Sequence, residues 1–254
     1  MSESTPALSA NGLTKHYGST TAVEDLDLQI PRGVVYGFLG PNGAGKTTTM
    51  QLLCGLIDPT DGEAHVAGTP CTERRELVER IGLLPEEPPL YDELTGREQL
   101  QFAADLRNVR WDDIADRALE LCEELDLVTD LDRRIGGYST GMQTKTAFVQ
   151  AVQHDPEVLF LDEPTSGLDP RAARTLRERI VDIADDDATV FLSTHILPVV
   201  EAVADRIGVL HDGRLVATGS PDDLAGNGEH TGGERSLEDA FLQLTSEESA
   251  TPPN

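Results

Sequence analysis

One eight-residue stretch constrains the fold of this chain more than any other feature. Residues 40–47 read GPNGAGKT and match the pattern GxxxxGK followed by Ser or Thr. The stretch follows an apolar run, residues 34–39, and precedes a helical segment over residues 48–56. In that context glycines let backbone N–H groups turn inward around phosphates, and the helix N-terminus favours negative charge. The stretch therefore predicts a phosphate-binding loop; the plainer alternative is a glycine-rich turn before a helix.

Side-chain chemistry assigns roles within this loop. The Lys46 ammonium can reach the β- and γ-phosphates of a nucleoside triphosphate, and the Thr47 hydroxyl can hold Mg²⁺. Lysine stands at only three positions, Lys15, Lys46 and Lys145, and arginine supplies every other cation, so a lysine in this loop is a selective use of the residue. The other loop residues expected to contact a nucleotide are Gly40, Asn42, Gly43, Ala44, Gly45 and Thr48.

A second motif places two carboxylates at the end of an apolar strand. Residues 158–161 read VLFL and are followed by Asp162 and Glu163. Asp162 can hold Mg²⁺ through water, and Glu163 can polarise an attacking water. Alone, such a pair is more typical of a solvated strand end. After a complete phosphate loop, it predicts that the bound nucleotide is hydrolysed.

Short apolar runs separated by helical patterns predict an α/β fold. The runs suit strands buried on both faces of a parallel sheet, although periodicity alone does not exclude buried helix. They occupy residues 34–39, 81–84, 158–161 and 189–192. Residues 89 to about 153 carry no strand signal. A capping box at Thr95–Glu98 predicts a helix through about Leu106, and residues 112–127 have helical spacing, so this region reads as a helical insertion.

The remaining segments give local signals. Asp169-Pro170 predicts a helix start, with Pro at the first helical position. Asp212-Gly213 between two apolar runs predicts a hairpin. Residues 236–244 predict a last short helix, whereas residues 1–7 read as a frayed start and residues 246–254 as a disordered tail.

The charge balance is strongly acidic. The chain has 254 residues, 46 Asp or Glu against 20 Lys or Arg, and a formal charge of −26. Acidic residues are scattered along the whole chain as pairs rather than collected in a tail. Scattered acid with scarce lysine is typical of proteins from salt-accumulating microbes, which predicts a halophilic archaeal origin; the plainer alternative is an ordinary acidic cytosolic protein. Either way the charge disfavours nucleic acid as a partner.

The cysteine positions and the hydropathy indicate the redox compartment of the protein and its relation to a membrane. Cys54, Cys71 and Cys122 lie far apart, without metal-ligand spacing, which favours reduced thiols in a cytosolic protein. No apolar run approaches the roughly 18 residues that a membrane span needs, and the first residues do not resemble a signal peptide. A membrane role is therefore expected only through a partner.

Several further motifs surround the phosphate loop and the Asp162–Glu163 strand end, and their order resembles that of a known family. Residues 138–142, Tyr-Ser-Thr-Gly-Met, precede the Asp162 strand; residues 166–169, Ser-Gly-Leu-Asp, follow Glu163; residues 193–195, Ser-Thr-His, end the next apolar strand. With Tyr17 ahead of the loop, this order resembles the nucleotide-binding subunit of ABC transporters over residues 8–225. The resemblance implies a P-loop parallel sheet core, an antiparallel β subdomain and a helical subdomain at 89–153, with residues 226–254 forming the short helix and tail.

The resemblance also implies residue roles. Tyr17 corresponds to the aromatic that stacks on adenine, although a core Tyr is the alternative, and Val23 would also touch the base. His195 corresponds to the histidine that contacts the γ-phosphate. Glu86 stands where the family has a Gln that senses Mg²⁺ and the lytic water; adjacent Glu87 leaves the assignment open by one residue.

The segment 138–142 departs from the family's LSGGQ. Ser139 and Gly141 are retained, whereas Thr140 and Met142 replace a Gly and a Gln. Similar variants, with Glu at the Glu86 position, occur in the branch that resembles daunorubicin-type and sodium-type exporters. In the family these residues cap ATP held by a second copy, and Asp169 links the two sites.

The leading hypothesis is an ATP-hydrolysing subunit of an ABC transporter, binding ATP and Mg²⁺. It would dimerise on ATP and drive a separate multispan membrane permease, for export, at the cytoplasmic face of the membrane. Two alternatives remain: a soluble ABC-type ATPase of DNA repair or translation, and a regulatory module that binds ATP but hydrolyses it weakly. The cargo is not readable, because the permease selects it.

Overall fold

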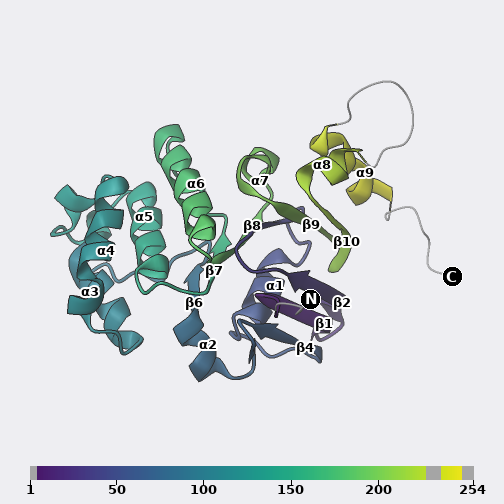
Figure 1. Cartoon of the computed structure of the whole chain (residues 1–254), viewed down its shortest axis with the longest axis horizontal. Helices are drawn as coiled ribbons and strands as arrows, with labels where there is room; N and C mark the ends of the chain where they lie inside the picture. Colours follow the sequence, from purple (N-terminus) through teal and green to yellow (C-terminus); the bar gives the residue numbers. More distant parts are fainter. Residues whose placement is uncertain (1–4, 227–235, 248–254) are drawn as a thin grey trace.

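The computed structural model describes residues 5–226 and 236–247. It holds two sheets, a helical region at one end and two short helices, α8 and α9, at the other (Figure 1). The four predicted apolar runs all form strands of the larger sheet, which confirms the α/β interpretation.

The larger sheet has the strand order β10-β9-β3-β8-β7-β6. Its strands are β3 (Val35–Leu39), β6 (Ile81–Leu84), β7 (Val158–Asp162), β8 (Thr189–Thr194), β9 (Arg206–His211) and β10 (Arg214–Gly219). Strands β9, β3, β8, β7 and β6 run parallel, and β10 pairs antiparallel with β9. The carboxyl ends of the parallel strands therefore meet at one edge, where ligands bind in open α/β sheets.

Residues of β3, β7 and β8 are buried almost throughout, as expected for strands covered on both faces. Phe191 of β8 packs against Phe38 and Phe160 of the neighbouring strands, with ring centroids 5.0 and 5.6 Å apart. The helices packed around this sheet include α1 (Lys46–Leu53), α6 (Pro170–Asp185) and α7 (Leu197–Val203).

The smaller sheet is antiparallel and has the order β2-β1-β4-β5. Its strands are β1 (Leu8–Tyr17), β2 (Thr20–Ile30), β4 (Asp61–Val66) and β5 (Thr69–Pro70), and α2 (Arg74–Arg80) follows. Its buried residues join the core that contains Phe38, Phe160 and Phe191, so the two sheets share one hydrophobic core. The register of β1 against β2 shifts at three places.

The helical region contains α3 (Gly96–Leu106), α4 (Trp111–Glu124) and α5 (Thr140–Val152). The predicted capping box is present: Thr95 Oγ1 accepts from the Glu98 N–H, and the Thr95 N–H donates to Glu98 Oε2 at 2.8 Å. Buried apolar side chains of all three helices pack in one cluster with β6, β7 and β8. The region thus forms a continuation of the sheet's core.

The ends of the chain correct two predictions. Ala7 is buried, and its backbone bonds Ile30 and Ala67, so the predicted frayed start is wrong at that residue because it extends β1 into the sheet. Helix α9 (Leu237–Glu247) passes the predicted helix end at Leu244 and takes in the first two residues of the predicted tail. Residues 1–4 and 248–254 lie outside the described residues. Helix α8 (Pro221–Gly226) was not predicted.

Two local predictions are confirmed. Asp212 and Gly213 have φ of 45° and 80° and form the turn between β9 and β10. Asp169 caps α6, with Pro170 as the first helical residue. The three cysteines are buried and unpaired.

Candidate functional site

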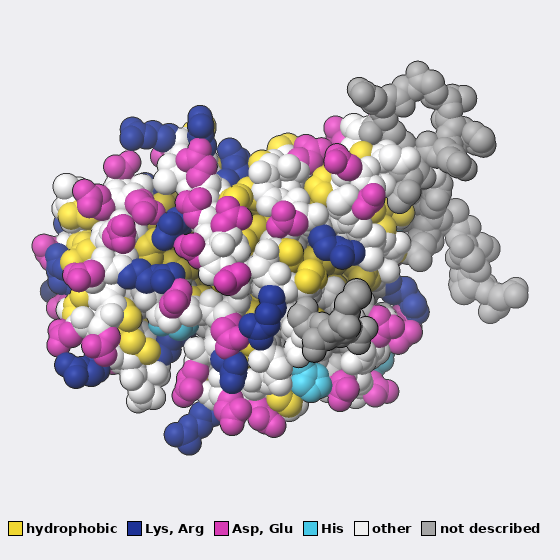
Figure 2. Space-filling view, in the orientation of Figure 1, with side chains coloured by type: hydrophobic (Ala, Val, Ile, Leu, Met, Phe, Trp, Pro, Cys, Tyr) yellow, Lys and Arg dark blue, Asp and Glu magenta, His cyan; other side chains and the backbone are white. Residues whose placement is uncertain are grey.

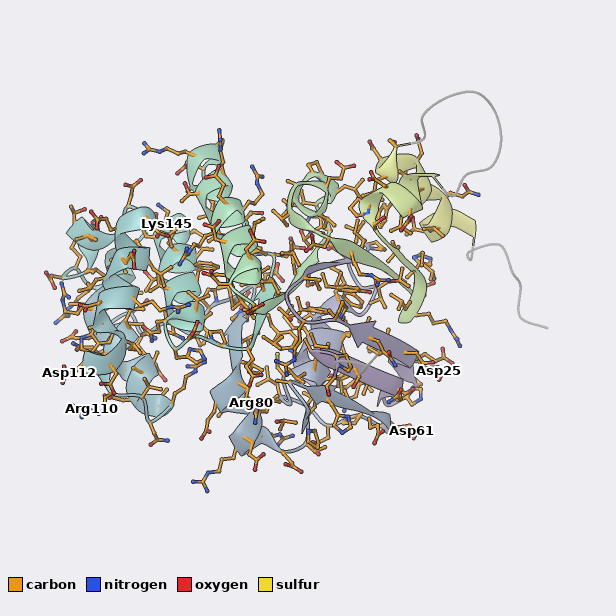
Figure 3. The ribbon with its side chains drawn as sticks, in the orientation of Figure 1. Asp25, Asp61, Arg80, Arg110, Asp112 and Lys145 are labelled. Atoms are coloured by element: carbon orange, nitrogen blue, oxygen red, sulfur yellow. The ribbon has the colours of Figure 1, made fainter. Side chains whose placement is uncertain are left out.

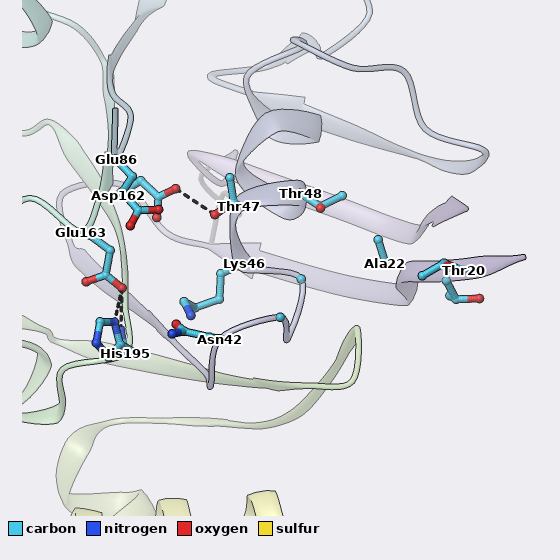
Figure 4. A pocket seen from close by; sticks show the side chains of 13 residues that line it. Thr20, Ala22, Asn42, Lys46, Thr47, Thr48, Glu86, Asp162, Glu163 and His195 are labelled. Atoms are coloured by element: carbon cyan, nitrogen blue, oxygen red, sulfur yellow. Dashed lines mark hydrogen bonds and ion pairs between the residues drawn. The ribbon is translucent and has the colours of Figure 1, made fainter. Parts of the chain in front are cut away.

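The glycine-rich loop connects β3 to α1 at the carboxyl edge of the larger sheet (Figure 4). Gly45 has φ of 104°, and a Cβ on it would lie 2.3 Å from the Ala22 carbonyl oxygen of β2. Both the backbone angle and the contact exclude any side chain there. The smaller sheet therefore packs against the loop and fixes the loop's N–H groups at the start of α1.

Lys46 is the first residue of α1 and is 7% exposed. Its Nζ donates to the carbonyl oxygens of Gly40 and Pro41, at 2.8 and 3.1 Å. Burial lowers the pKa of Lys46, and the nearby carboxylates of Glu163, Asp162 and Glu86 partly offset that effect. The ammonium is thus held at the loop by uncharged carbonyl oxygens, which a negatively charged phosphate oxygen can replace.

Thr47 and Asp162 join the loop to the end of β7. Thr47 Oγ1 donates to Asp162 Oδ2 at 3.0 Å (Figure 4). Burial raises the pKa of Asp162, and the hydrogen bond from Thr47 opposes that rise. A hydroxyl and a carboxylate oxygen this close match the oxygen ligands that Mg²⁺ takes beside phosphates and water. The residues present therefore fit a magnesium ion.

Glu163 follows Asp162 and has an unusual backbone, with φ of 48°. A left-handed conformation costs a non-glycine residue roughly 1–2 kcal/mol. The carboxylate is held by residues that end β8: Thr194 Oγ1 donates to Oε2 at 2.7 Å, and the His195 N–H donates to Oε1 at 2.9 Å. His195 Nδ1 lies 2.6 Å from the same Oε1, and half of the His195 side chain is exposed. The left-handed backbone at Glu163 brings its carboxylate next to the His195 imidazole and into the same pocket as Lys46.

These groups line one pocket of about 500 Å³. Ten of the predicted site residues line it: Asn42, Gly43, Gly45, Lys46, Thr47, Thr48, Glu86, Asp162, Glu163 and His195. Glu86 is among them and Glu87 is not. Thr20, Thr21 and Ala22 also line the pocket, and sequence reasoning missed them. Gly40 and Ala44 belong to the loop but are not among the residues that line the pocket, and the Gly40 carbonyl accepts from Lys46.

The two residues predicted to contact a base differ in position. Tyr17 is 49% exposed, which excludes the core alternative, and the Lys15 ammonium lies 5.2 Å from its ring centroid. Val23 has no exposed surface and packs in the core, so its predicted base contact is wrong. Thr20, Thr21 and Ala22 of β2 line the pocket, whereas Val23, the next residue, packs into the core.

Comparison with known proteins decides the family. A family profile described as ABC transporter matches residues 23–166, more than half of the chain. The chain belongs to the ABC transporter family. The bacitracin transport ATP-binding protein of Bacillus licheniformis is 39% identical over 206 residues, which are 80% of this chain and 66% of that protein.

Two further comparisons agree. The daunorubicin/doxorubicin resistance ATP-binding protein of Streptomyces peucetius is 38% identical over 221 residues, 87% of this ABC ATPase and 67% of that protein. The chain thus spans about two thirds of the length of these relatives. A solved structure of an ATP-binding subunit of an ABC transporter aligns with a TM-score of 0.88 at 32% identity, covering 94% of this chain and 100% of that one. The predicted ABC ATPase fold is confirmed.

The segment 138–142 of this ABC ATPase lies apart from the phosphate pocket. Ser139 is exposed and caps α5, its Oγ accepting from the Met142 N–H at 3.3 Å. Thr140 lines a second, smaller cavity of about 50 Å³ together with Glu86 and Glu163. Gly141 approaches the Gly167 carbonyl, and a Cβ there would lie 3.2 Å from it. None of the three is among the residues that line the larger pocket.

Asp169 also stays outside that pocket. Its Oδ1 accepts from the Ala172 and Arg171 N–H groups at 3.0 and 2.9 Å, and these hydrogen bonds lower the pKa of Asp169. The part of this ABC ATPase that the structure describes has no helix both long and apolar enough to cross a membrane.

Proposed function

We propose that this ABC ATPase binds ATP with Mg²⁺, dimerises on ATP and hydrolyses it to drive a separate multispan permease in export. One observation carries the proposal. A single pocket unites a phosphate-facing lysine, a hydroxyl–carboxylate pair suited to Mg²⁺ and a glutamate held beside a histidine. That combination matches the groups that phosphoryl transfer to water requires.

In the proposed complex, the triphosphate of ATP lies along the phosphate loop, residues 40–47. Backbone N–H groups at the start of α1 point at the phosphates, and Lys46 exchanges the Gly40 and Pro41 carbonyls for phosphate oxygens. Thr47 directly and Asp162 through water would hold Mg²⁺, with Glu86 beside them in the pocket. When bound, the ion neutralises the charge that develops on the phosphate oxygens.

Glu163 and His195 act on the far side of the γ-phosphate. Glu163 orients a water and accepts its proton, since its carboxylate lines the pocket beside His195, whereas that of Asp162 is bonded to Thr47. His195 contacts the γ-phosphate with its half-exposed ring. The ring can make that contact through Nε2 while Nδ1 stays 2.6 Å from Glu163 Oε1.

Dimerisation completes the site. Ser139 and Thr140 are exposed at the N-terminus of α5, which offers N–H groups and partial positive charge to an anion outside the chain. A second copy facing head to tail would present its γ-phosphate to Ser139, Thr140 and Gly141. Asp169, exposed at the start of α6, would lie in that interface.

The relatives favour export. One is named for bacitracin transport and the other for daunorubicin/doxorubicin resistance. We extend that role to this chain, with a multispan permease as partner and with the ATPase at the cytoplasmic face of the membrane. The acidic surface does not suit nucleic acid.

The same surface supports a halophilic origin. The formal charge is −26, and Figure 2 shows acidic side chains spread over the visible face among fewer basic ones. Figure 3 places Asp25 and Asp61 at the smaller sheet and Asp112 at the helical end, where it pairs with Arg110 at 3.5 Å. Salt at about 1 M shortens the screening length to roughly 3 Å and relieves such repulsion.

ATP turnover by the purified chain tests the function. We expect Mg²⁺-dependent phosphate release that is highest in molar KCl and falls as KCl is withdrawn. Glu163→Gln should lower kcat by about 100-fold or more while retaining ATP binding, and should elute as a dimer with ATP. Glu178→Gln, on the exposed face of α6, is the control. A Glu163→Gln variant with normal turnover would exclude the proposed role.

A further inference from the structure

The Glu163 carboxylate has three hydrogen-bonding neighbours, and only one of them is the His195 ring. The Thr194 hydroxyl reaches Oε2 at 2.7 Å, whereas the backbone N–H and ring Nδ1 of His195 both reach Oε1, at 2.9 and 2.6 Å. The two oxygens are therefore held separately. Of the side chains that the structure describes, Thr194 alone has a hydrogen bond to Oε2.

The Thr194 hydroxyl is fixed as a donor toward Glu163. The residue ends β8, opposite Leu39 of β3, and its side chain is 1% exposed. The Ile196 N–H donates to the same hydroxyl oxygen at 3.1 Å. A hydroxyl has one hydrogen, and with its oxygen already accepting from Ile196, that hydrogen is available for Oε2. Burial and this second bond leave the hydroxyl little freedom to turn away.

We propose that Thr194 is a positioning residue for hydrolysis, holding the Glu163 carboxylate at Oε2 while His195 holds Oε1. The inference rests on the proposed function, in which the His195 ring contacts the γ-phosphate. Both His195 contacts go to Oε1, so among the described side chains only the Thr194 hydroxyl fixes the rotation of the carboxylate through Oε2. Without the hydroxyl, one carboxylate oxygen has no donor, and the carboxylate can rotate about its last side-chain bond.

Three variants test this inference on the full chain in molar KCl. Thr194→Val keeps the shape and removes the hydroxyl, and Thr194→Ser restores a hydroxyl. Thr189→Val is the matched control, because Thr189 is the fully buried first residue of the same strand and its hydroxyl accepts from the Gly33 N–H at 3.1 Å. Steady-state ATP hydrolysis gives kcat and KM, and a fluorescent ATP analogue gives nucleotide affinity.

We expect Thr194→Val to lower kcat by about tenfold or more with KM changed by less than about twofold, the pattern of a contact that matters in the transition state. Thr194→Ser should recover most of kcat, and Thr189→Val should keep it despite a lower melting temperature. In a Glu163→Ala background, Thr194→Val should leave the residual rate unchanged, since the carboxylate through which it acts is gone.

Other results overturn the inference. These are an unchanged kcat in Thr194→Val, a rise in KM alone, an equal loss of kcat in Thr189→Val, or a Thr194→Ser variant as slow as Thr194→Val. If circular dichroism shows that Thr194→Val does not fold, Thr194→Ala is assayed by the same criteria. A wild-type chain without ATPase activity would instead contradict the proposed function, which keeps the two failures distinct.

Discussion

The enclosed phosphate end of the site and its two exposed neighbours are built differently. Around Lys46, each functional side chain is tied to another part of the same chain, through Gly40, Asp162 or Glu163. Tyr17, Ser139 and Thr140 are instead exposed, and neither Tyr17 nor the Ser139–Gly141 segment lines the pocket. From this difference we expect a single chain to bind phosphates by itself, and we expect the base and the γ-phosphate to gain further contacts only when Tyr17 and a second copy approach.

Lys46→Ala gives the largest expected effect, because it removes the lysine from the enclosed phosphate end of the site. The substitution removes the buried ammonium from the place where phosphate charges converge, and we expect ATP affinity to fall by about 100-fold or more. Isothermal titration with ATP and Mg²⁺ measures it. Lys145→Ala, on α5 outside the pocket, is the control, and equal losses in both variants would contradict the assigned role.

Ser139→Ala tests the exposed neighbour on α5. ATP binding by the single chain should be unchanged, while kcat should fall by about tenfold, with a cap loss of about 1 kcal/mol in stability. Mixing this variant with Lys46→Ala sharpens the comparison: mixed dimers contain one site with both groups intact. Recovery of activity on mixing shows that Ser139 acts on the other copy, and no recovery would show that it acts within its own chain or not at all.

Tyr17→Ala addresses the base end. Stacking of a base on an aromatic ring contributes about 1–3 kcal/mol, so ATP affinity should weaken by roughly tenfold. Tyr17→Phe keeps the ring and should bind normally. Because the Lys15 ammonium lies over one face of the ring, we expect adenine to stack on the other face. Equal binding by all three proteins would remove Tyr17 from the site.

A smaller effect concerns the joint between the helical region and the sheet. His154 follows α5, and its Nε2 lies 3.0 Å from the Ile81 carbonyl at the start of β6. Burial, together with the charge of Arg107, lowers the pKa of His154 to about 4. The unfolded chain therefore binds more protons between about pH 6.5 and 4, and stability falls as pH drops through that window.

His154→Gln should flatten this dependence. In the wild type, the free energy of unfolding should fall by roughly 1–2 kcal/mol between pH 7 and pH 5 because of this group. Urea unfolding in molar KCl at both pH values gives the difference. The same slope in wild type and variant would mean that His154 is not what makes this joint sensitive to acid.

Local motifs account for most of what could be predicted. The phosphate loop, the Asp162–Glu163 strand end and the capping box at Thr95 are short motifs whose residues stand close together in the sequence. The predictions fail where distant segments meet. Thr20, Thr21 and Ala22 reach the pocket because the smaller sheet presses on Gly45, a contact without a signal in sequence.

Strand phase explains the error at Val23. The pairing of β1 with β2 shifts register three times, so the side-chain alternation could not be followed from Tyr17 onward. Ala7 was missed for a similar reason: its burial depends on Ile30 and Ala67, which lie far along the chain. The antiparallel sheet itself was predicted only through the family resemblance, since its strands mix polar and apolar residues.

The buried position of Lys46 has a practical consequence for chemical labelling of the lysine side chains. Lysine stands at three positions only, so an acylating reagent has few side-chain targets in this protein. The lowered pKa of Lys46 leaves more of its amine in the nucleophilic neutral form, and a bound phosphate chain would cover it. Lys145, on α5 away from the pocket, provides an internal standard (Figure 3). The ratio of acylation at the two residues, read by peptide mass spectrometry, therefore reports the nucleotide-loaded fraction without any introduced label.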